Sequence, residues 1–360
     1  MNTAISSVSA ITTAKPVIAK RGRTATPSNT PPDDSNSSRR VHGALRLVST
    51  KALSRDEWLE ARKQGIGSSD AAAAVGLNPY QSQLELWMIK TGRDDNLPKI
   101  DPDDETSPMY WGHILEPIVA QHYTKRTGHK VRRINSVLQH TDPDKSWMLA
   151  NLDYSIVGND EVQILECKTA GEFGSRLWRD GVPDYVQCQV QHQLAVTGKK
   201  AADVCVLICG QEIRVYRIER DDELIDRLIE LERKFWQYVI TDTEPPADGS
   251  DSAGQALRAL YPYDSGNSLD LTDDPAMTTA FVGMVKMRAE IESRQLVESE
   301  LKQTIQQCMG EASKAIFRSG SVTWKRSKSG SRRFLVNAAS AASNSSTQTI
   351  QSEPQEQHHD

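Results

Sequence analysis

Three charged side chains between Leu149 and Thr169 have the types and the spacing to act together on one bond. The stretch reads LANLDYSIVGNDEVQILECKT, which is typical of two strands joined by a Gly-Asn-Asp turn. Strand alternation predicts that Asp153 lies on the polar face of the first strand, and that Glu166 and Lys168 share a face of the second. Two carboxylates can bind a divalent cation, and a lysine beside them can orient a water molecule. These groups are the minimum for metal-assisted hydrolysis of a phosphodiester.

The same spacing also has an ordinary explanation. Three charged residues at these intervals arise often by chance, and a surface hairpin would simply expose them to water. The alternation further predicts that Leu152, Tyr154 and Ile156 share the apolar face of the first strand. The hairpin alone leaves a catalytic cluster and a solvated surface both open.

Two short helices are predicted before the hairpin. A capping box formed by Ser54 and Glu57 begins a helix that contains Arg62. The sequence GIGSSD follows and opens a second short helix near Ser69. The free amides of this turn are either a phosphate cradle or, more simply, a helix end capped by Ser69 or Asp70.

Two longer helices flank the hairpin along the chain. A helix predicted from about residue 109 to 127 places Glu116 beside an apolar stripe, where it is either an exposed edge residue or a site carboxylate. A helix that begins at Pro183 carries Gln189 and Gln193 four residues apart on one face. Glutamines beside a core are often only helix formers, but this helix has four of them: Gln187, Gln189, Gln191 and Gln193.

The composition of the 360-residue chain predicts one globular core with less regular flanks. Roughly 200 residues between Thr50 and Thr241 hold most of the aromatic and β-branched side chains, which is enough for one domain. The ends are rich in Ser, Thr, Asn and Gln and lack apolar periodicity. We therefore expect a disordered basic segment (1–48), the folded domain (49–241), a linker (242–275), a long helix (276–310), a basic hairpin-like segment (311–337) and a disordered tail (338–360).

The net charge of −5 conceals two basic regions. Residues 1–50 contain seven Lys or Arg against Asp33 and Asp34, and residues 312–334 contain seven with no acidic residue. Basic segments on an acidic protein suit contact with a polyanion, although solvated tails explain them nearly as well.

The cysteines and the hydropathy pattern bear on the compartment. Five cysteines form no CxxC pair and no even disulfide framework, which is typical of reduced, buried thiols. There is no run of 18 apolar residues, and the first ten residues lack the pattern of a signal peptide. We expect a cytoplasmic protein that does not contact a membrane.

Five blocks of the sequence, in order, resemble the YqaJ-type viral recombinase family. They are GIGSSDAAAAVGLNPY, MYWGHILEPIVAQHY, LANLDYSI, ILECKTA and VPDYVQCQVQHQLAVTG, within roughly residues 55–240. This family is related to the phage lambda exonuclease and to the PD-(D/E)xK nucleases. The resemblance implies an α/β, restriction-endonuclease-like core, with a central mixed β-sheet flanked by helices, to which this chain adds a C-terminal helical arm.

The resemblance also implies a role for each matching residue. Asp153, Glu166 and the carbonyl of Cys167 would bind Mg²⁺ or Mn²⁺, and Glu116 would complete the metal site directly or through water. Lys168 would orient or help to deprotonate the attacking water, and Gln189 would contact the substrate phosphate. Arg62 and Ser69 match positions that help to hold the 5′-phosphate of the cut strand in the lambda enzyme, which implies substrate-binding roles for both.

The implied function is a Mg²⁺-dependent exonuclease that digests double-stranded DNA ends from 5′ to 3′. Its 3′ single strands would pass to a single-strand annealing protein in a bacterial or phage-infected cell. The lambda enzyme is a ring-shaped trimer, and analogy with it implies a homo-oligomer. Two departures concern end recognition and the motif: Asn151 stands where the lambda enzyme has a Ser that contacts phosphate, and Leu152 replaces the Pro that gives the fold its name.

Two other functions stay open at this stage. The fold also hosts endonucleases and nickases, and the sequence does not fix whether the active site is a closed tunnel. A DNA-binding recombination mediator that has lost catalysis is the alternative outside the enzymes, and the intact Asp153, Glu166 and Lys168 argue against it.

Overall fold

The computed structural model describes residues 40–41, 43–99, 101, 103–328 and 330–338. The chain divides after Asp264 into two compact units, called unit 1 and unit 2 below. The predicted disorder of the chain ends falls mostly on residues 1–39 and 339–360, which lie outside the described residues.

The centre of unit 1 is a five-stranded mixed sheet. Its strands are β3 (Lys130–Arg133), β6 (Tyr154–Val157), β7 (Ile164–Ala170), β8 (Ala201–Ile208) and β9 (Glu212–Glu219). They lie in the order β3-β6-β7-β8-β9, and every pair is antiparallel except β7 with β8. The central parallel pair is buried on both faces over most of its length, as a sheet covered on both sides requires. The predicted mixed sheet is confirmed.

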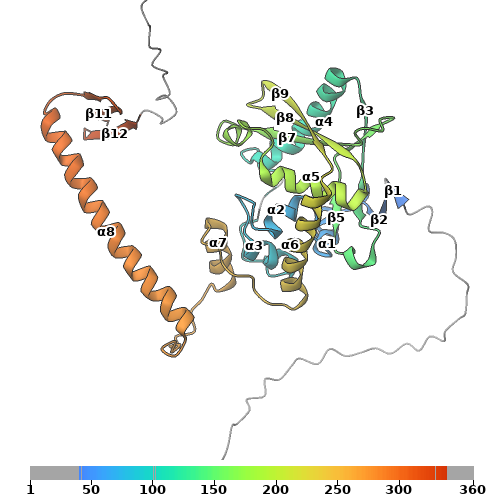
Figure 1. The fold of residues 1–360 in the computed structure, drawn as a ribbon, viewed down its shortest axis with the longest axis horizontal. Helices are drawn as coiled ribbons and strands as arrows, with labels where there is room; N and C mark the ends of the chain where they lie inside the picture. Colours follow the sequence, from blue (N-terminus) through green and yellow to red (C-terminus); the bar gives the residue numbers. More distant parts are fainter. Residues whose placement is uncertain (1–39, 42, 100, 102, 329, 339–360) are drawn as a thin grey trace, which may run out of the picture. The chain divides into compact units, whose positions relative to one another are not determined.

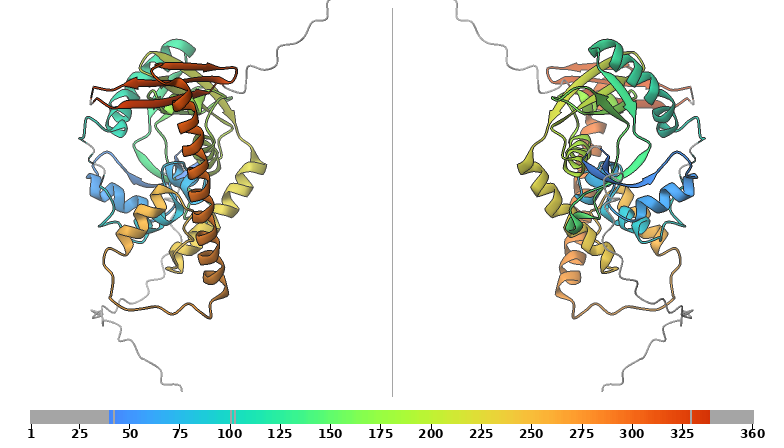
Figure 2. Two further views of the ribbon diagram at one scale, coloured as in Figure 1. Left: turned by 90° about the vertical axis from the view of Figure 1, so that its left-hand side faces the viewer. Right: turned by 90° about the vertical axis from the view of Figure 1, so that its right-hand side faces the viewer.

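Two helices cover the opposite faces of this sheet, as Figures 1 and 2 show. They are α4 (Pro108–Thr127) and α5 (Asp184–Thr197). Val119 of α4 packs in one core cluster with Leu165 of β7, and Val190 of α5 packs in the other with Ile164 of β7. Because neighbouring residues of a strand point to opposite faces, β7 joins the two halves of the core.

A second sheet extends the folded unit further toward the N-terminus than we expected. It consists of β1 (Arg40–Val41), β2 (Ala44–Ser49), β4 (Ser136–Gln139) and β5 (Leu149–Asn151). Ala44 is fully buried, and β2 pairs with β4. The boundary predicted at residue 49 is therefore wrong, because β2 is stabilised by a strand far away in the sequence and carries little local signal.

The predicted hairpin is interrupted where the candidate aspartate lies. β5 and β6 belong to different sheets, and the chain breaks its strand conformation at Leu152 and Asp153. Leu152 packs in the core cluster of α5, whereas Tyr154 and Ile156 pack in that of α4. The prediction that these three side chains share a face was wrong, because the break resets the alternation.

The remaining helices of unit 1 are α1 (Arg55–Lys63), α2 (Ala71–Ala74), α3 (Gln83–Lys90), α6 (Asp222–Ile240) and α7 (Asp251–Leu260). Of these, α2 and α6 pack against α5, and α3 and α7 pack against each other. α7 lies within the predicted linker, yet its Ala253 and Ala256 are buried and its Ser252 hydroxyl donates to Glu85 at 2.6 Å. The first part of the predicted linker is therefore folded. The buried face of α7 consists of small alanines between polar residues, and such a face gives little apolar signal in the sequence.

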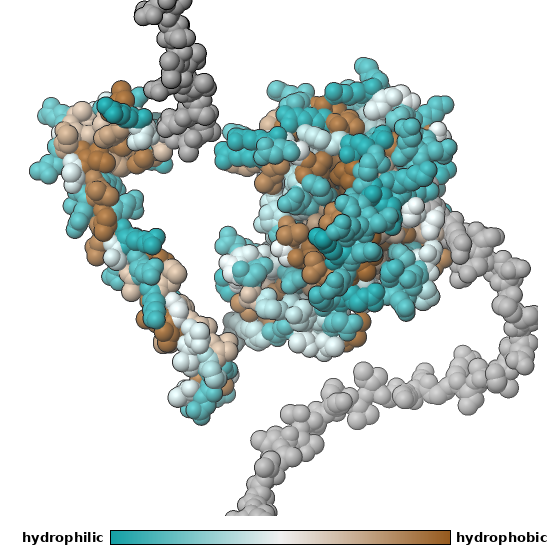
Figure 3. Space-filling view, viewed as in Figure 1, coloured by the Kyte–Doolittle hydropathy of each residue, from teal (hydrophilic) through white to brown (hydrophobic). Residues whose placement is uncertain are grey.

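Unit 2 combines one long helix with a small antiparallel sheet. Its elements are α8 (Pro275–Met309), β10 (Lys314–Phe317), β11 (Gly320–Arg326) and β12 (Arg332–Ala338). The expected hairpin-like segment has three strands, because a turn at Arg318 and Ser319 adds β10. Apolar side chains lie exposed along α8 (Figure 3). Among the described helices of the chain, none is both long and apolar enough to cross a membrane.

Candidate active site

The structure brings Asp153, Glu166 and Lys168 together in the central sheet, at the point where β6 and β7 stop pairing. Asp153 lies in the break before β6, and the other two residues point from β7. The backbone N–H of Cys167 donates to Asp153 Oδ2 at 2.9 Å, and Lys168 Nζ donates to Glu166 Oε1 at 2.8 Å. The convergence predicted from alternation is present, although the hairpin is not continuous.

Two glutamine amides of α5 complete this cluster. Gln189 donates to Glu166 Oε1 at 2.6 Å and accepts from Lys168 Nζ at 2.8 Å. Gln193 donates to Glu166 Oε2 at 2.8 Å. The sequence reasoning did not assign Gln193 a role, although its spacing of four residues from Gln189 placed both amides on one face. Glu166 is therefore fixed by three side-chain donors.

The electrostatics of the cluster leave an excess of negative charge. Burial and the nearby Glu166 carboxylate raise the pKa of Asp153 well above its usual range. Burial alone would lower the pKa of Lys168, but Glu166 and Asp153 outweigh it and raise this pKa. Lys168 is thus a cation at neutral pH, and one ammonium faces two carboxylates. A further cation at this position would relieve their repulsion.

These groups line a cavity of about 400 Å³ together with residues from α1, α4 and the GIGSSD turn. Asp153, Glu166, Lys168 and Gln189 lie on one part of its wall, and the lining also includes Arg62, Ser69 and Glu116. Seven of the predicted site residues, and Cys167 with them, therefore surround one space.

Glu116 lies in the same cavity, but it has a different partner. Its Oε1 accepts a hydrogen bond of 2.6 Å from Arg133 on β3. Among the residues that the structure describes, no three His, Cys, Asp or Glu side chains form a group able to hold a metal ion. The prediction that Glu116 completes a metal site stays a prediction.

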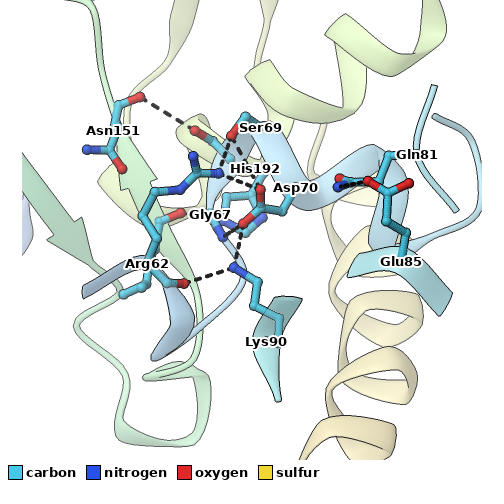
Figure 4. Close-up of polar contacts among 11 residues, drawn as sticks. Arg62, Gly67, Ser69, Asp70, Gln81, Glu85, Lys90, Asn151 and His192 are labelled. Carbon is cyan, nitrogen blue, oxygen red and sulfur yellow. Dashed lines mark hydrogen bonds and ion pairs between the residues drawn. The ribbon is translucent and has the colours of Figure 1, made fainter. Parts of the chain in front are cut away.

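Arg62 and Ser69 form a second polar cluster, which Figure 4 shows in detail. Arg62 Nη2 donates to Ser69 Oγ at 2.8 Å, and its guanidinium forms an ion pair with Asp70. Lys90 of α3 donates to Asp70 Oδ2 at 2.6 Å and to the carbonyl of Arg62 at 2.8 Å. The N–H of Gly67, which begins the short 3-10 turn Ser68–Asp70, also donates to Asp70, whereas the side chain of Asp70 does not cap α2 as the sequence suggested.

This second cluster sets one carboxylate, Asp70, against two cations, Arg62 and Lys90, so it keeps an excess positive charge. Burial would raise the pKa of Asp70, but Arg62 and Lys90 outweigh it and hold the pKa well below the usual range. The Asp70 side chain is 8% exposed and that of Lys90 is 2% exposed, so their charges are compensated inside the protein. The remaining surface of the Arg62 guanidinium lines the cavity.

The oxygen atoms that face one another where β6 and β7 separate suit a hard divalent cation. The N–H and C=O of one strand residue point to the same side, so the Cys167 carbonyl points toward the edge where its N–H meets Asp153. Two carboxylates and a carbonyl match the preference of Mg²⁺, which usually keeps waters and substrate phosphate as its other ligands. The donor set and the unrelieved negative charge therefore fit Mg²⁺ or Mn²⁺.

The sequence is similar to a known protein family and to a protein of Bacillus subtilis. The family model described as the YqaJ-like viral recombinase domain matches residues 57–200. Uncharacterized protein YqaJ of Bacillus subtilis (strain 168) is 37% identical over 284 residues, which is 78% of this chain and 86% of that protein.

Solved structures resemble the chain more distantly. An alkaline exonuclease from Laribacter hongkongensis is 22% identical and covers 52% of this chain and 93% of its own, with a TM-score of 0.43. A phage related exonuclease from Haemophilus somnus 129PT is 13% identical and covers 49% of this chain and 96% of its own, with a TM-score of 0.35.

Proposed function

This chain belongs to the YqaJ-like viral recombinase family, and we propose that it is a divalent-metal-dependent nuclease that digests linear double-stranded DNA. The convergence of Asp153, Glu166 and Lys168 in one cavity is the observation that carries this proposal. We further propose a 5′-to-3′ exonuclease that leaves 3′ single strands for a single-strand annealing protein.

The metal ion would be held by Asp153, Glu166 and the carbonyl of Cys167, with Glu116 joining directly or through water. When bound, it would act as a Lewis acid that makes a water molecule nucleophilic and offsets the negative charge on the phosphate. Asp153 and Glu166 fix its position, because the Cys167 amide orients the first carboxylate and the α5 glutamines orient the second.

Lys168 and Gln189 would act on the water and the phosphodiester. The raised pKa of Lys168 keeps an ammonium in the cavity, so it donates hydrogen bonds and stabilises the charge that develops on the phosphate. As the family resemblance implies, Lys168 would orient the attacking water or help to deprotonate it. Gln189 already accepts from Lys168, and its amide would contact the substrate phosphate.

Arg62 and Ser69 would bind the 5′-phosphate at the end of the cut strand. Their side chains are joined by a hydrogen bond and face the same cavity as the carboxylates. A guanidinium held by Asp70 is preorganised for a phosphate, which costs less binding energy than ordering a free arginine.

The test compares three DNA substrates in the presence of Mg²⁺. They are end-labelled linear duplexes with a 5′-phosphate or a 5′-hydroxyl, and a closed circle. We expect nucleotide release from the phosphorylated linear duplex only. Lys168→Ala should lower the rate by roughly 10²–10³-fold, because it removes a charge that stabilises the transition state. Lys234→Ala, at an exposed lysine on α6, is the matched control.

Each other result has a definite meaning. Cutting of the closed circle would replace the exonuclease with an endonuclease or nickase of the same fold. If the protein bound DNA but released no nucleotides with Mg²⁺ or Mn²⁺, it would instead be a recombination mediator that binds DNA without catalysis.

A further inference from the structure

The hairpin formed by β11 and β12 places like charges directly opposite one another. In its register Lys325 faces Arg333, and Arg326 faces Arg332. Like charges at such cross-strand positions destabilise a hairpin, because their side chains start only about 5 Å apart. Two consecutive basic pairs therefore need compensation from the protein or from something that it binds.

The protein compensates one of these four residues. Arg332 turns inward, donates to the carbonyls of Gly310 and Ala312 at 2.7 and 2.6 Å, and stacks 3.6 Å from the ring centre of Trp324. It therefore serves the structure of unit 2. Arg326 donates to the carbonyl of Gly330 at 3.3 Å and so supports the turn.

The other basic residues of this hairpin end have no acidic partner. We call Lys325, Lys328 and Arg333 the basic tip; all three are exposed. Within the described part of the chain, no ion pair involves any of them, and residues 312–334 contain no acidic residue. By contrast, α8 carries equal numbers of acidic and basic residues, four of each.

The basic tip belongs to an ordered hairpin rather than to a loose tail. Seven register pairs join β11 to β12, and Lys302 of α8 lies 5.6 Å from the ring centre of Phe334. The side chain of Val322 on β11 is buried. The charges are consequently presented with little remaining backbone entropy to lose on binding.

The shape of this hairpin end suits duplex DNA. β10 pairs with β11 only from Gly320 to Thr323, so the part with the basic tip is a two-stranded ribbon beyond the third strand. The major groove admits a two-stranded β-ribbon, and lysine and arginine side chains on such a ribbon reach the flanking phosphates.

We propose that the basic tip binds the phosphate backbone of duplex DNA, as a contact made by unit 2 in addition to the catalytic cavity of unit 1. The choice of DNA as the polyanion rests on the proposed function. The phosphates would supply the negative charge that the cross-strand basic pairs lack. This contact would hold the enzyme on its substrate without taking part in hydrolysis.

The test measures the affinity of the full-length protein for a fluorescent duplex in EDTA over a series of salt concentrations. The triple variant Lys325→Gln, Lys328→Gln, Arg333→Gln should bind roughly 10- to 100-fold more weakly near 0.1 M salt. Its slope of log K against log salt should be shallower by up to about 2.7, since each lost phosphate contact contributes about 0.9.

The matched control removes the same charge from the same unit. Lys286→Gln, Arg288→Gln, Arg294→Gln changes three exposed residues of α8 and should leave the slope almost unchanged. Equal losses in both triple variants would show an effect of net charge alone and overturn the proposal, as would unchanged binding by the tip variant. A melting temperature checks folding, and the single variants Lys328→Gln and Arg333→Gln give a second, milder measurement.

The outcome is independent of catalysis. A wild-type protein that releases no nucleotides with Mg²⁺ would refute the proposed nuclease function, while a shallower salt slope in the tip variant would still support the DNA contact.

Discussion

Asp70 and Asp153 are two aspartates close to one cavity, and their surroundings hold them in opposite electrostatic states. Asp70 is paired with Arg62 and Lys90, and its pKa is lowered. Asp153 faces Glu166, and its pKa is raised. Asp70 is buried and Asp153 is half-buried, and burial raises the pKa of both carboxyl groups, so the opposite directions come from the neighbouring charges.

The contrast separates a structural role from a catalytic one. In the cluster of Asp70 with Arg62 and Lys90 the buried carboxylate is fully paired, so it has no need of a metal ion and can fix the position of the Arg62 side chain. An unbalanced cluster such as Asp153 with Glu166 retains an affinity for a cation, which is what a metal-dependent site requires. Substitutions at the two aspartates should therefore have opposite consequences.

The largest expected effect is the loss of activity in Asp153→Asn. Removing one of the two carboxylates should lower the rate of nucleotide release by roughly 10³-fold, since metal stabilisation of the transition state is worth several kcal/mol. Without metal, the free energy of unfolding should not fall, because the change removes a charge that repels Glu166. Nucleotide release and urea denaturation in EDTA measure the two quantities, and Asp226→Asn, at an exposed position on α6, is the control.

Asp70→Asn should lower the free energy of unfolding by about 3–5 kcal/mol, because Lys90 would remain buried without a counter-charge. Urea denaturation at neutral pH measures this change. A loss of less than 1 kcal/mol would contradict the structural role and remove the contrast with Asp153.

The stability that the Asp70 carboxylate contributes should depend on pH in a predictable direction. The folded-state pKa of Asp70 lies below the unfolded value of about 3.9, so its carboxylate stabilises the fold above that pH. This contribution is lost as the pH falls below about 4 toward the folded-state pKa. The stability difference between wild type and Asp70→Asn should therefore shrink between about pH 5 and 2, and a constant difference would argue against it.

The smallest effect expected here concerns Gln193. Gln193→Ala should lower kcat by about 10-fold with little change in KM, because Glu166 Oε2 loses its amide donor and its carboxylate is less well oriented. Gln187→Ala on the same helix is the control, since that amide instead donates to the Val182 carbonyl. Equal rates in the two variants would mean that Gln189 and Lys168 suffice to position Glu166.

Periodicity and local chemistry predicted much of the site. Alternation along the hairpin placed Glu166 and Lys168 on one face, and a spacing of four residues placed Gln189 and Gln193 together. The resemblance to a known family then linked these residues to Arg62. Such patterns are readable because strand and helix periods depend only on neighbours along the chain.

Contacts between distant segments were not predictable in the same way. The sequence did not indicate that Lys90 would neutralise Asp70, or that Glu116 would bind Arg133. It also gave no sign that α7 would pack on the core within a polar segment. Each of these contacts needs a particular path of the backbone between two elements.

The amino-acid sequence by itself determined which residues could do chemistry and, within an unbroken strand or helix, which of them share a face. The tertiary structure alone decided which charges are compensated: Asp70 meets two cations, whereas Asp153 meets a second carboxylate. The physical reason is that a charge inside a protein depends on everything within a few ångströms of it, and only the folded chain brings those groups together.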